Sequence, residues 1–186
     1  DEVEVFKFKR PDKLLVNNWQ SWGPSKVIQK DFQLNFPREL IQKFGFSASI
    51  MPESYFDNLL SDYYIASERF FVGCLSSKVA HPYFRIDGDE VSVRLKYFGM
   101  NFSEWTETES VVVLVDKPEV TLPYYADLVA KENVVNISDK RLVGWSSWYQ
   151  YFVDFDYEKM CANLENARGK GYDVFQIDDA WEVDIG

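Results

Sequence analysis

The sequence has 186 residues, of which 30 are acidic and 20 basic, so its net charge is −10 at pH 7. Phosphates and anionic lipid surfaces attract basic segments, so this charge disfavours nucleic acid and membrane surfaces as partners. No apolar run approaches the roughly 20 residues of a membrane-spanning helix, and the cytoplasm is the predicted location. The first ten residues, DEVEVFKFKR, read like the interior of a longer chain, so we expect this sequence to be part of one.

The first 120 residues carry β patterns, beginning with short apolar stretches. A short helix is predicted near Pro37–Phe44. Short strands separated by turn signals indicate a sandwich of two sheets. The predicted strands are Val5–Phe8, Leu14–Asn17, Phe70–Leu75, Tyr83–Ile86, Glu90–Tyr97 and Val111–Val115.

The most distinct of these patterns is a hairpin around Asp87-Gly88. In Glu90–Tyr97 apolar residues alternate with polar ones, which is the period of a half-buried strand. An Asp-Gly pair between two such runs favours a tight turn, so the sequence predicts an antiparallel pair.

The pattern becomes helical over Leu122–Asn133. Tyr125, Leu128 and Val129 fall on one helical face, and we interpret this stretch as a linker helix. No GxGxxG or GxxxxGK[ST] motif occurs, so nucleotide binding has no support.

A strand, a helix and a second strand follow. Leu142–Trp148 is strand-like, Asp156 can cap a helix through Ala167, and Val174–Asp178 is a short apolar strand. Strands joined in this way should be parallel. Because one βαβ unit cannot cover both faces of its strands, we expect residues from about 137 onward to begin a larger α/β domain. The alternative is that the unit packs on the sandwich.

Five of the six tryptophans fall in three short motifs. These are NNWQSWG (Asn17–Gly23), VGWSSWYQYF (Val143–Phe152) and FQIDDAW (Phe175–Trp181). If Trp145 and Trp148 share a strand, they should point to opposite faces. Such residues commonly fill cores. Combined with carboxylates at the ends of parallel strands, however, flat aromatic faces and in-plane acceptors are suited to binding a sugar.

Two adjacent aspartates, Asp178 and Asp179, end the last predicted strand. Neighbouring residues on a strand point to opposite faces, which disfavours a catalytic pair holding a sugar between them. Accepting hydrogen bonds from sugar hydroxyls is the favoured role. A hard-oxygen metal site with Glu182 and Asp184, or a solvated acidic loop, are the alternatives.

The remaining candidate groups have structural interpretations. Cys74 and Cys161 lie in no metal or redox motif and are predicted to be small buried residues. His81 is the only histidine, and no catalytic triad can be assembled around it. These residues therefore give no sequence support to zinc, redox or triad chemistry.

Four motifs span nearly the whole chain: LLVNNWQSWGP (Leu14–Pro24), SSKVAHPYF (Ser76–Phe84), GWSSWYQYF (Gly144–Phe152) and VFQIDDAWEVDIG (Val174–Gly186). At these motifs, and in their order, the sequence resembles the α-galactosidases of glycoside hydrolase family 36. The resemblance implies an N-terminal β-sandwich over residues 1–121, a linker helix over 122–136, and the first βαβ unit of a truncated (β/α)8 TIM barrel over 137–186.

The resemblance also implies roles for five residues in a galactose pocket. Trp22 would wall the site from the sandwich, Trp148 and Tyr149 would line it, and Asp178 and Asp179 would accept hydrogen bonds from galactose hydroxyls. The family's catalytic nucleophile and acid/base fall beyond Gly186, so this segment is expected to hold no catalytic residue.

The resemblance further implies the activity of the longer protein: retaining hydrolysis of terminal α-linked galactose in melibiose- or raffinose-type sugars, with no metal and no cofactor. The partner is a small carbohydrate, and an oligomer is possible. The alternatives are a non-catalytic carbohydrate-binding sandwich, a raffinose-synthase-type galactosyltransferase, an α-N-acetylgalactosaminidase, and a structural or interaction domain.

Overall fold

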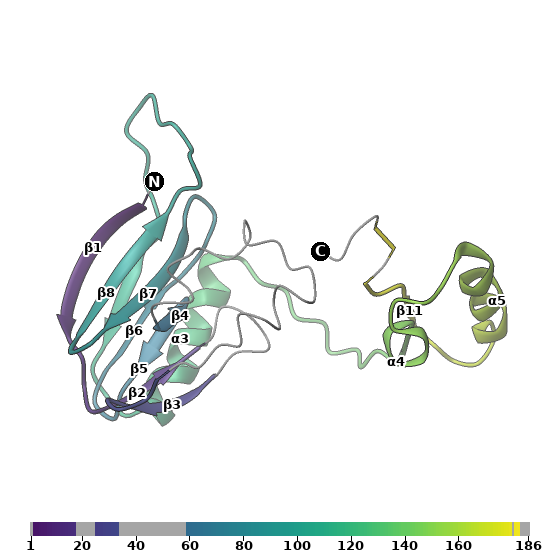
Figure 1. Ribbon diagram of the computed structural model, residues 1–186, viewed down its shortest axis with the longest axis horizontal. Helices are drawn as coiled ribbons and strands as arrows, with labels where there is room; N and C mark the ends of the chain where they lie inside the picture. Colours follow the sequence, from purple (N-terminus) through teal and green to yellow (C-terminus); the bar gives the residue numbers. More distant parts are fainter. Residues whose placement is uncertain (1, 18–24, 34–58, 180, 183–186) are drawn as a thin grey trace. The chain divides into compact units, whose positions relative to one another are not determined.

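A computed structural model of the chain describes residues 2–17, 25–33, 59–179 and 181–182. The described residues divide into two compact units (Figure 1), one ending at Asn136 and the other beginning at Ile137. Unit 1 contains two antiparallel sheets and one long helix, and unit 2 contains a small parallel sheet with two helices.

The two sheets of unit 1 form a β-sandwich, as predicted. One sheet has the strand order β1-β8-β7-β4 and the other β3-β2-β5-β6-β9. Figure 1 shows them as two layers. Their bounds are β1 Glu2–Lys9, β2 Lys13–Val16, β3 Lys26–Gln29, β4 Leu59–Asp62, β5 Tyr64–Ala66, β6 Phe71–Cys74, β7 His81–Asp87, β8 Glu90–Lys96 and β9 Val111–Leu114.

The predicted hairpin is confirmed. Strands β7 and β8 pair antiparallel from His81↔Lys96 to Asp87↔Glu90, with Gly88 and Asp89 as the two-residue loop. Gly88 has φ +55°, a left-handed conformation that glycine adopts without steric cost. The hairpin supplies four strand residues to the main core: Phe84, Ile86, Val91 and Val93.

Strands β3, β4 and β5 were not predicted. In β4, Ser61 is fully buried among apolar neighbours. Its Oγ accepts a hydrogen bond from the Asn17 amide at 2.7 Å and donates to the Tyr64 carbonyl oxygen at 2.8 Å. These hydrogen bonds stabilise a polar residue in the core. The local sequence pattern does not predict the one from Asn17, which lies 44 residues away. The helix predicted near Pro37–Phe44 lies outside the described residues.

Both faces of the second sheet are covered, because strands β5 and β6 alternate between two apolar clusters. Ile65 and Val72 face the main core between the sheets, whereas Ala66 and Phe71 face helix α3 (Pro118–Glu132). This helix begins four residues earlier than predicted, with Pro118 at its first turn, where a missing amide hydrogen costs nothing.

Helix α3 contacts the sheet through Tyr125. Its ring lies 4.5 Å from that of Phe71, and its hydroxyl donates a hydrogen bond to the Cys74 carbonyl oxygen. A Cβ atom at Gly73 would lie 2.7 Å from the Tyr125 ring, which is closer than real Cβ contacts. Gly73 therefore allows the helix to approach the strand.

The two cysteines have different environments. Both thiols are free, with Cys74 buried and Cys161 half-buried. Burial of the thiol, together with the charges of Glu109 and Asp62, raises the pKa of Cys74 to about 12. We expect iodoacetamide at pH 8 to alkylate Cys161 in the folded chain and to spare Cys74, because a protonated, buried thiol does not react. Peptide mass spectrometry measures the order in which the two thiols are alkylated, and the denatured chain serves as the control. Equal rates, or faster alkylation of Cys74, would contradict the prediction.

Unit 2 is the predicted strand–helix–strand unit. Strands β10 (Gly144–Ser146) and β11 (Val174–Gln176) pair in parallel, with α4 (Trp148–Tyr151) and α5 (Tyr157–Ala167) between them in sequence. Asp156 caps α5 as predicted, because its side chain accepts a hydrogen bond from the Lys159 amide at 2.7 Å.

One prediction for unit 2 is wrong. Leu142–Trp148 is not a continuous strand, because β10 ends at Ser146 and Trp148 is the first residue of α4. The alternation rule therefore does not apply to Trp145 and Trp148. Trp145 remains on the strand and stacks on Phe175 of β11, with ring centroids 4.3 Å apart.

No described helix has the length and apolar character needed to cross a membrane.

Candidate functional site: the carboxyl ends of two parallel strands

The candidate site lies where β10 and β11 end. Because the two strands are parallel and paired in register, their carboxyl ends meet at the same edge of the sheet. Ser146 is the last residue of β10 and Ser147 comes directly after it, whereas Asp178 and Asp179 come shortly after the end of β11. The site is therefore built from residues about 30 positions apart in sequence.

Asp178 is held by hydrogen bonds from both strands. Its Oδ2 atom accepts from Ser146 Oγ at 3.1 Å and from Gln176 Nε2 at 2.8 Å, and its Oδ1 accepts from the Asp179 amide at 3.0 Å. A carboxylate offers about four acceptor positions, so about one remains for a ligand hydroxyl. The carboxylate is half-buried, and its orientation is fixed before a ligand arrives.

Ser147 connects the two strand ends and is fully buried. Its amide donates to the Gln176 carbonyl oxygen at 3.1 Å, and its Oγ accepts from the Asp178 amide at 2.9 Å. Its own carbonyl oxygen accepts from the Tyr151 amide at 2.9 Å, which begins α4. Ser147 thus positions Asp178 and the aromatic helix together. Sequence reasoning missed this role, and the only signal was its place between two tryptophans.

The aromatic residues predicted for the site lie in α4. Trp148 is half-buried against Phe152, with ring centroids 4.3 Å apart, whereas Tyr149 is 93% exposed. Phe152 ends the helix with φ +56° and ψ −108°, a conformation that is costly for a residue with a side chain. This sharp end stops α4 after one turn.

The described residues bring together four of the five predicted site residues in unit 2: Trp148, Tyr149, Asp178 and Asp179 follow the ends of β10 and β11. Whether they contact a sugar stays a prediction. Trp22 lies outside the described residues, as does Asp184 of the alternative metal cluster. Among the residues that the structure does describe, no three His, Cys, Asp or Glu side chains gather so as to hold a metal ion.

His81 has a structural environment in unit 1. Its Nε2 atom lies 2.6 Å from Oδ1 of the buried Asp62, and its ring packs edge-on to Tyr63. The contact joins β7 to its neighbour β4. These contacts agree with the structural interpretation of His81.

The fold of the chain is similar to that of a known glycosidase. A structure of TtGalA, the α-galactosidase from Thermus thermophilus, solved in complex with stachyose, matches 97% of this chain with a TM-score of 0.54. The identity is 16%, so this likeness shows the fold alone. The chain spans 38% of the length of that structure.

The chain is therefore a protein of the class in which a β-sandwich is followed by a βαβ unit, and its fold is similar to that of an α-galactosidase. The family described as "Alpha-galactosidase, N-terminal" matches residues 1–115, which is more than half of the chain. The chain belongs to this family, and the resemblance seen at the sequence motifs is confirmed.

Proposed function

We propose that this chain is the N-terminal part of a retaining α-galactosidase that releases terminal α-linked galactose from melibiose- or raffinose-type oligosaccharides. The observation that carries the proposal is the placement of Asp178 at the carboxyl end of β11, held by Ser146 and Gln176 in an α-galactosidase-family chain. Stachyose bound to the Thermus relative supports an oligosaccharide substrate.

In this proposal unit 2 is the first βαβ unit of a (β/α)8 barrel. Barrel enzymes place their ligands at the carboxyl ends of the strands, which is where Asp178 and Asp179 lie. Three apolar residues in or beside the strands of unit 2 are each more than a third exposed: Val143, Val174 and Ile177. Such residues are suited to burial against neighbouring strands.

The proposed domain organisation is a sandwich over residues 1–121, a linker helix over 122–136 and the barrel start over 137–186. Within the site, Asp178 and Asp179 would accept hydrogen bonds from galactose hydroxyls, and Trp148, Tyr149 and Trp22 would contact its ring. Aromatic faces with in-plane carboxylates complement a sugar, whose C–H face is apolar and whose rim is polar.

The catalytic pair is proposed to lie outside these 186 residues. We therefore expect the purified 186-residue chain to release no p-nitrophenol from p-nitrophenyl α-galactoside, because a retaining enzyme needs both a nucleophile and an acid/base. The full-length galactosidase that contains the chain is the positive control. Turnover by the 186-residue chain that prefers the α-galactoside over the matching α-glucoside would refute the assignment.

A raffinose-synthase-type galactosyltransferase would use the same galactose-binding residues with a different acceptor. Product analysis of the full-length protein separates the two functions: free galactose indicates hydrolysis, and a lengthened sugar indicates transfer.

A further inference from the structure

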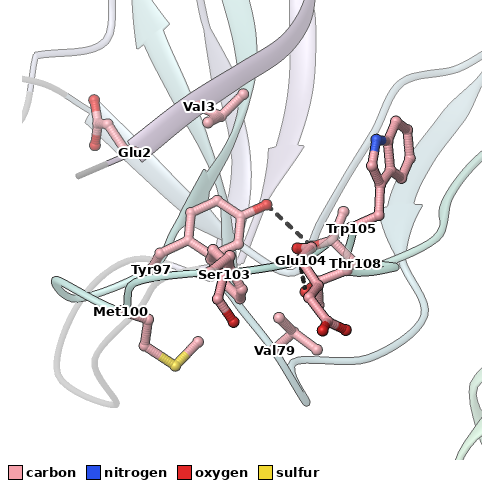
Figure 2. A pocket seen from close by; sticks show the side chains of 11 residues that line it. Glu2, Val3, Val79, Tyr97, Met100, Ser103, Glu104, Trp105 and Thr108 are labelled. Carbon is pink, nitrogen blue, oxygen red and sulfur yellow. Dashed lines mark hydrogen bonds between the residues drawn. The ribbon is translucent and has the colours of Figure 1, made fainter.

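A second candidate binding surface lies in unit 1. The segment between β8 and β9 forms one wall of a pocket of about 640 Å³, which Glu2, Val3 and Val79 complete (Figure 2). Small-molecule sites commonly have volumes of roughly 300–1,000 Å³. The pocket belongs wholly to unit 1 and shares no residue with the strand-end site of unit 2.

Aromatic side chains gather at this pocket. Trp105 is fully exposed, and Tyr97 and Phe102 meet edge to face with ring centroids 5.3 Å apart. Figure 2 shows the Tyr97 ring and the Trp105 indole on the same side of the segment. Scattered single apolar residues are normal on a surface, but a cluster around a pocket marks a binding site.

The polar lining indicates which ligand the pocket suits. The hydroxyls of Ser103, Thr106 and Thr108 line it together with the exposed Glu104, and no Lys, Arg or His lines it among the described residues. The absence of a cation from this lining disfavours phosphates and other anions. Hydroxyls, a carboxylate and flat aromatic faces are suited to a neutral polyhydroxylated molecule.

The pocket lining contains a second carboxylate, that of Glu2, and its negative charge is already paired with the guanidinium of Arg94. Arg94 Nη1 donates to it at 2.6 Å and the Tyr83 hydroxyl donates to it as well. Although partial burial acts to raise the pKa of Glu2, these two hydrogen bonds and the Arg94 charge hold it below its usual value. Its charge is therefore balanced within the protein, which argues against a cationic ligand at that end.

The pocket wall is anchored to the sandwich by a chain of hydrogen bonds. The Tyr97 hydroxyl donates to Thr108 Oγ1 at 3.1 Å, and Thr108 Oγ1 donates to Glu109 Oε2 at 2.8 Å. Glu109 is buried, and its carboxylate accepts from the amides of Val79 and Ala80 at 2.7 and 3.0 Å. A wall fixed in this way reduces the entropy lost on binding.

We propose that this pocket binds a neutral oligosaccharide, with Trp105 stacking on a sugar ring and Glu104 accepting hydrogen bonds from the sugar hydroxyls. The site goes beyond the proposed galactose pocket, and it would hold a carbohydrate chain on the sandwich independently of cleavage.

The test is an NMR titration of the ¹⁵N-labelled 186-residue chain with two neutral tetrasaccharides, stachyose and maltotetraose. The signals followed are the Trp105 indole N–H and the backbone amides of residues 103–108, which remain observable in the Trp105→Ala variant. We expect a saturable shift with at least one of them. Trp105→Ala should weaken binding roughly tenfold or more, because an aromatic anchor carries a large share of the energy of a small site. Since Trp105 is fully exposed, this variant should keep the fold.

Two matched controls make the result specific. Phe98→Ala removes another exposed aromatic ring of the same segment, one that contacts His81 and Lys96 and does not line the pocket. Asp178→Asn alters the strand-end site. Binding that survives both changes and is lost with Trp105→Ala supports the proposal. No saturable shift with either sugar, equal affinity in Trp105→Ala, or loss in Asp178→Asn alone would overturn it.

Discussion

In the full-length protein that contains this chain, which we propose to be an α-galactosidase, replacing Asp178 with asparagine is expected to lower kcat/KM for an aryl α-galactoside by roughly 10- to 100-fold. Hydrogen bonds to a charged group contribute about 1.5–3 kcal/mol, and each 1.4 kcal/mol is tenfold. The asparagine side chain also has one acceptor oxygen fewer than the carboxylate. In one orientation its NH2 group would face Ser146 Oγ and Gln176 Nε2, both of which donate hydrogen bonds to Asp178. In the other orientation it would face the backbone amide of Asp179, which is also a donor.

The measurement is steady-state kinetics beside a thermal unfolding curve for each variant. Asp173→Asn is the matched control, because Asp173 precedes β11 at the opposite end of the strand and pairs with Lys140 at 2.5 Å. The control should keep kcat/KM and change only stability. If Asp178→Asn had the kinetics of the unmodified enzyme, Asp178 would not contact the sugar.

Replacing Gly73 with alanine is expected to destabilise unit 1 by about 1–3 kcal/mol, the usual cost of overpacking a core. The added methyl would lie 2.7 Å from the Tyr125 ring and 2.8 Å from the Phe71 ring. Both rings are packed, so either α3 moves away from β6 or a side chain leaves its rotamer. The gain from restricting the unfolded chain, about 0.4–1 kcal/mol, is smaller.

Urea unfolding followed by far-UV circular dichroism gives the change in free energy. Gly144→Ala is the control, because its Cβ would meet its neighbours at an ordinary 3.5 Å. A Tyr125→Leu background should absorb part of the Gly73→Ala penalty, since it removes one of the two rings that the added methyl would meet. Full additivity of the two changes, or an unaltered midpoint for Gly73→Ala, would show that α3 does not constrain this position.

The elements that could be predicted from the sequence are those whose structure depends on residues close together in the chain. The β7–β8 hairpin follows from its alternating residues and its glycine turn, and α5 begins where Asp156 caps it. The family was also recognisable, because its tryptophan and aspartate motifs are contiguous in sequence.

Where the sequence misled, a distant partner decided the outcome. Ser61 looks unsuited to a core strand until the backbone amide of Asn17, 44 residues away, donates a hydrogen bond to its Oγ. The end of β10 depends on Ser147, whose partners Gln176 and Asp178 lie about 30 residues away. The pocket beside Trp105 needs Glu2 and Val79 to come together with the β8–β9 segment, which no local pattern predicts.

The packing of α3 also orders events during synthesis of the chain. Strand β9 ends at Leu114, yet the outer face of its sheet is covered only when Tyr125 reaches Phe71 and Asn133 donates to the Leu75 carbonyl oxygen at 2.8 Å. On the ribosome the sandwich therefore has an uncovered apolar face until residue 133 has left the exit tunnel. Domains generally fold as units from the N-terminus. By that point the residues that follow 133 inside the tunnel, which include the start of unit 2, have been added to the chain, so unit 1 closes while unit 2 is being made.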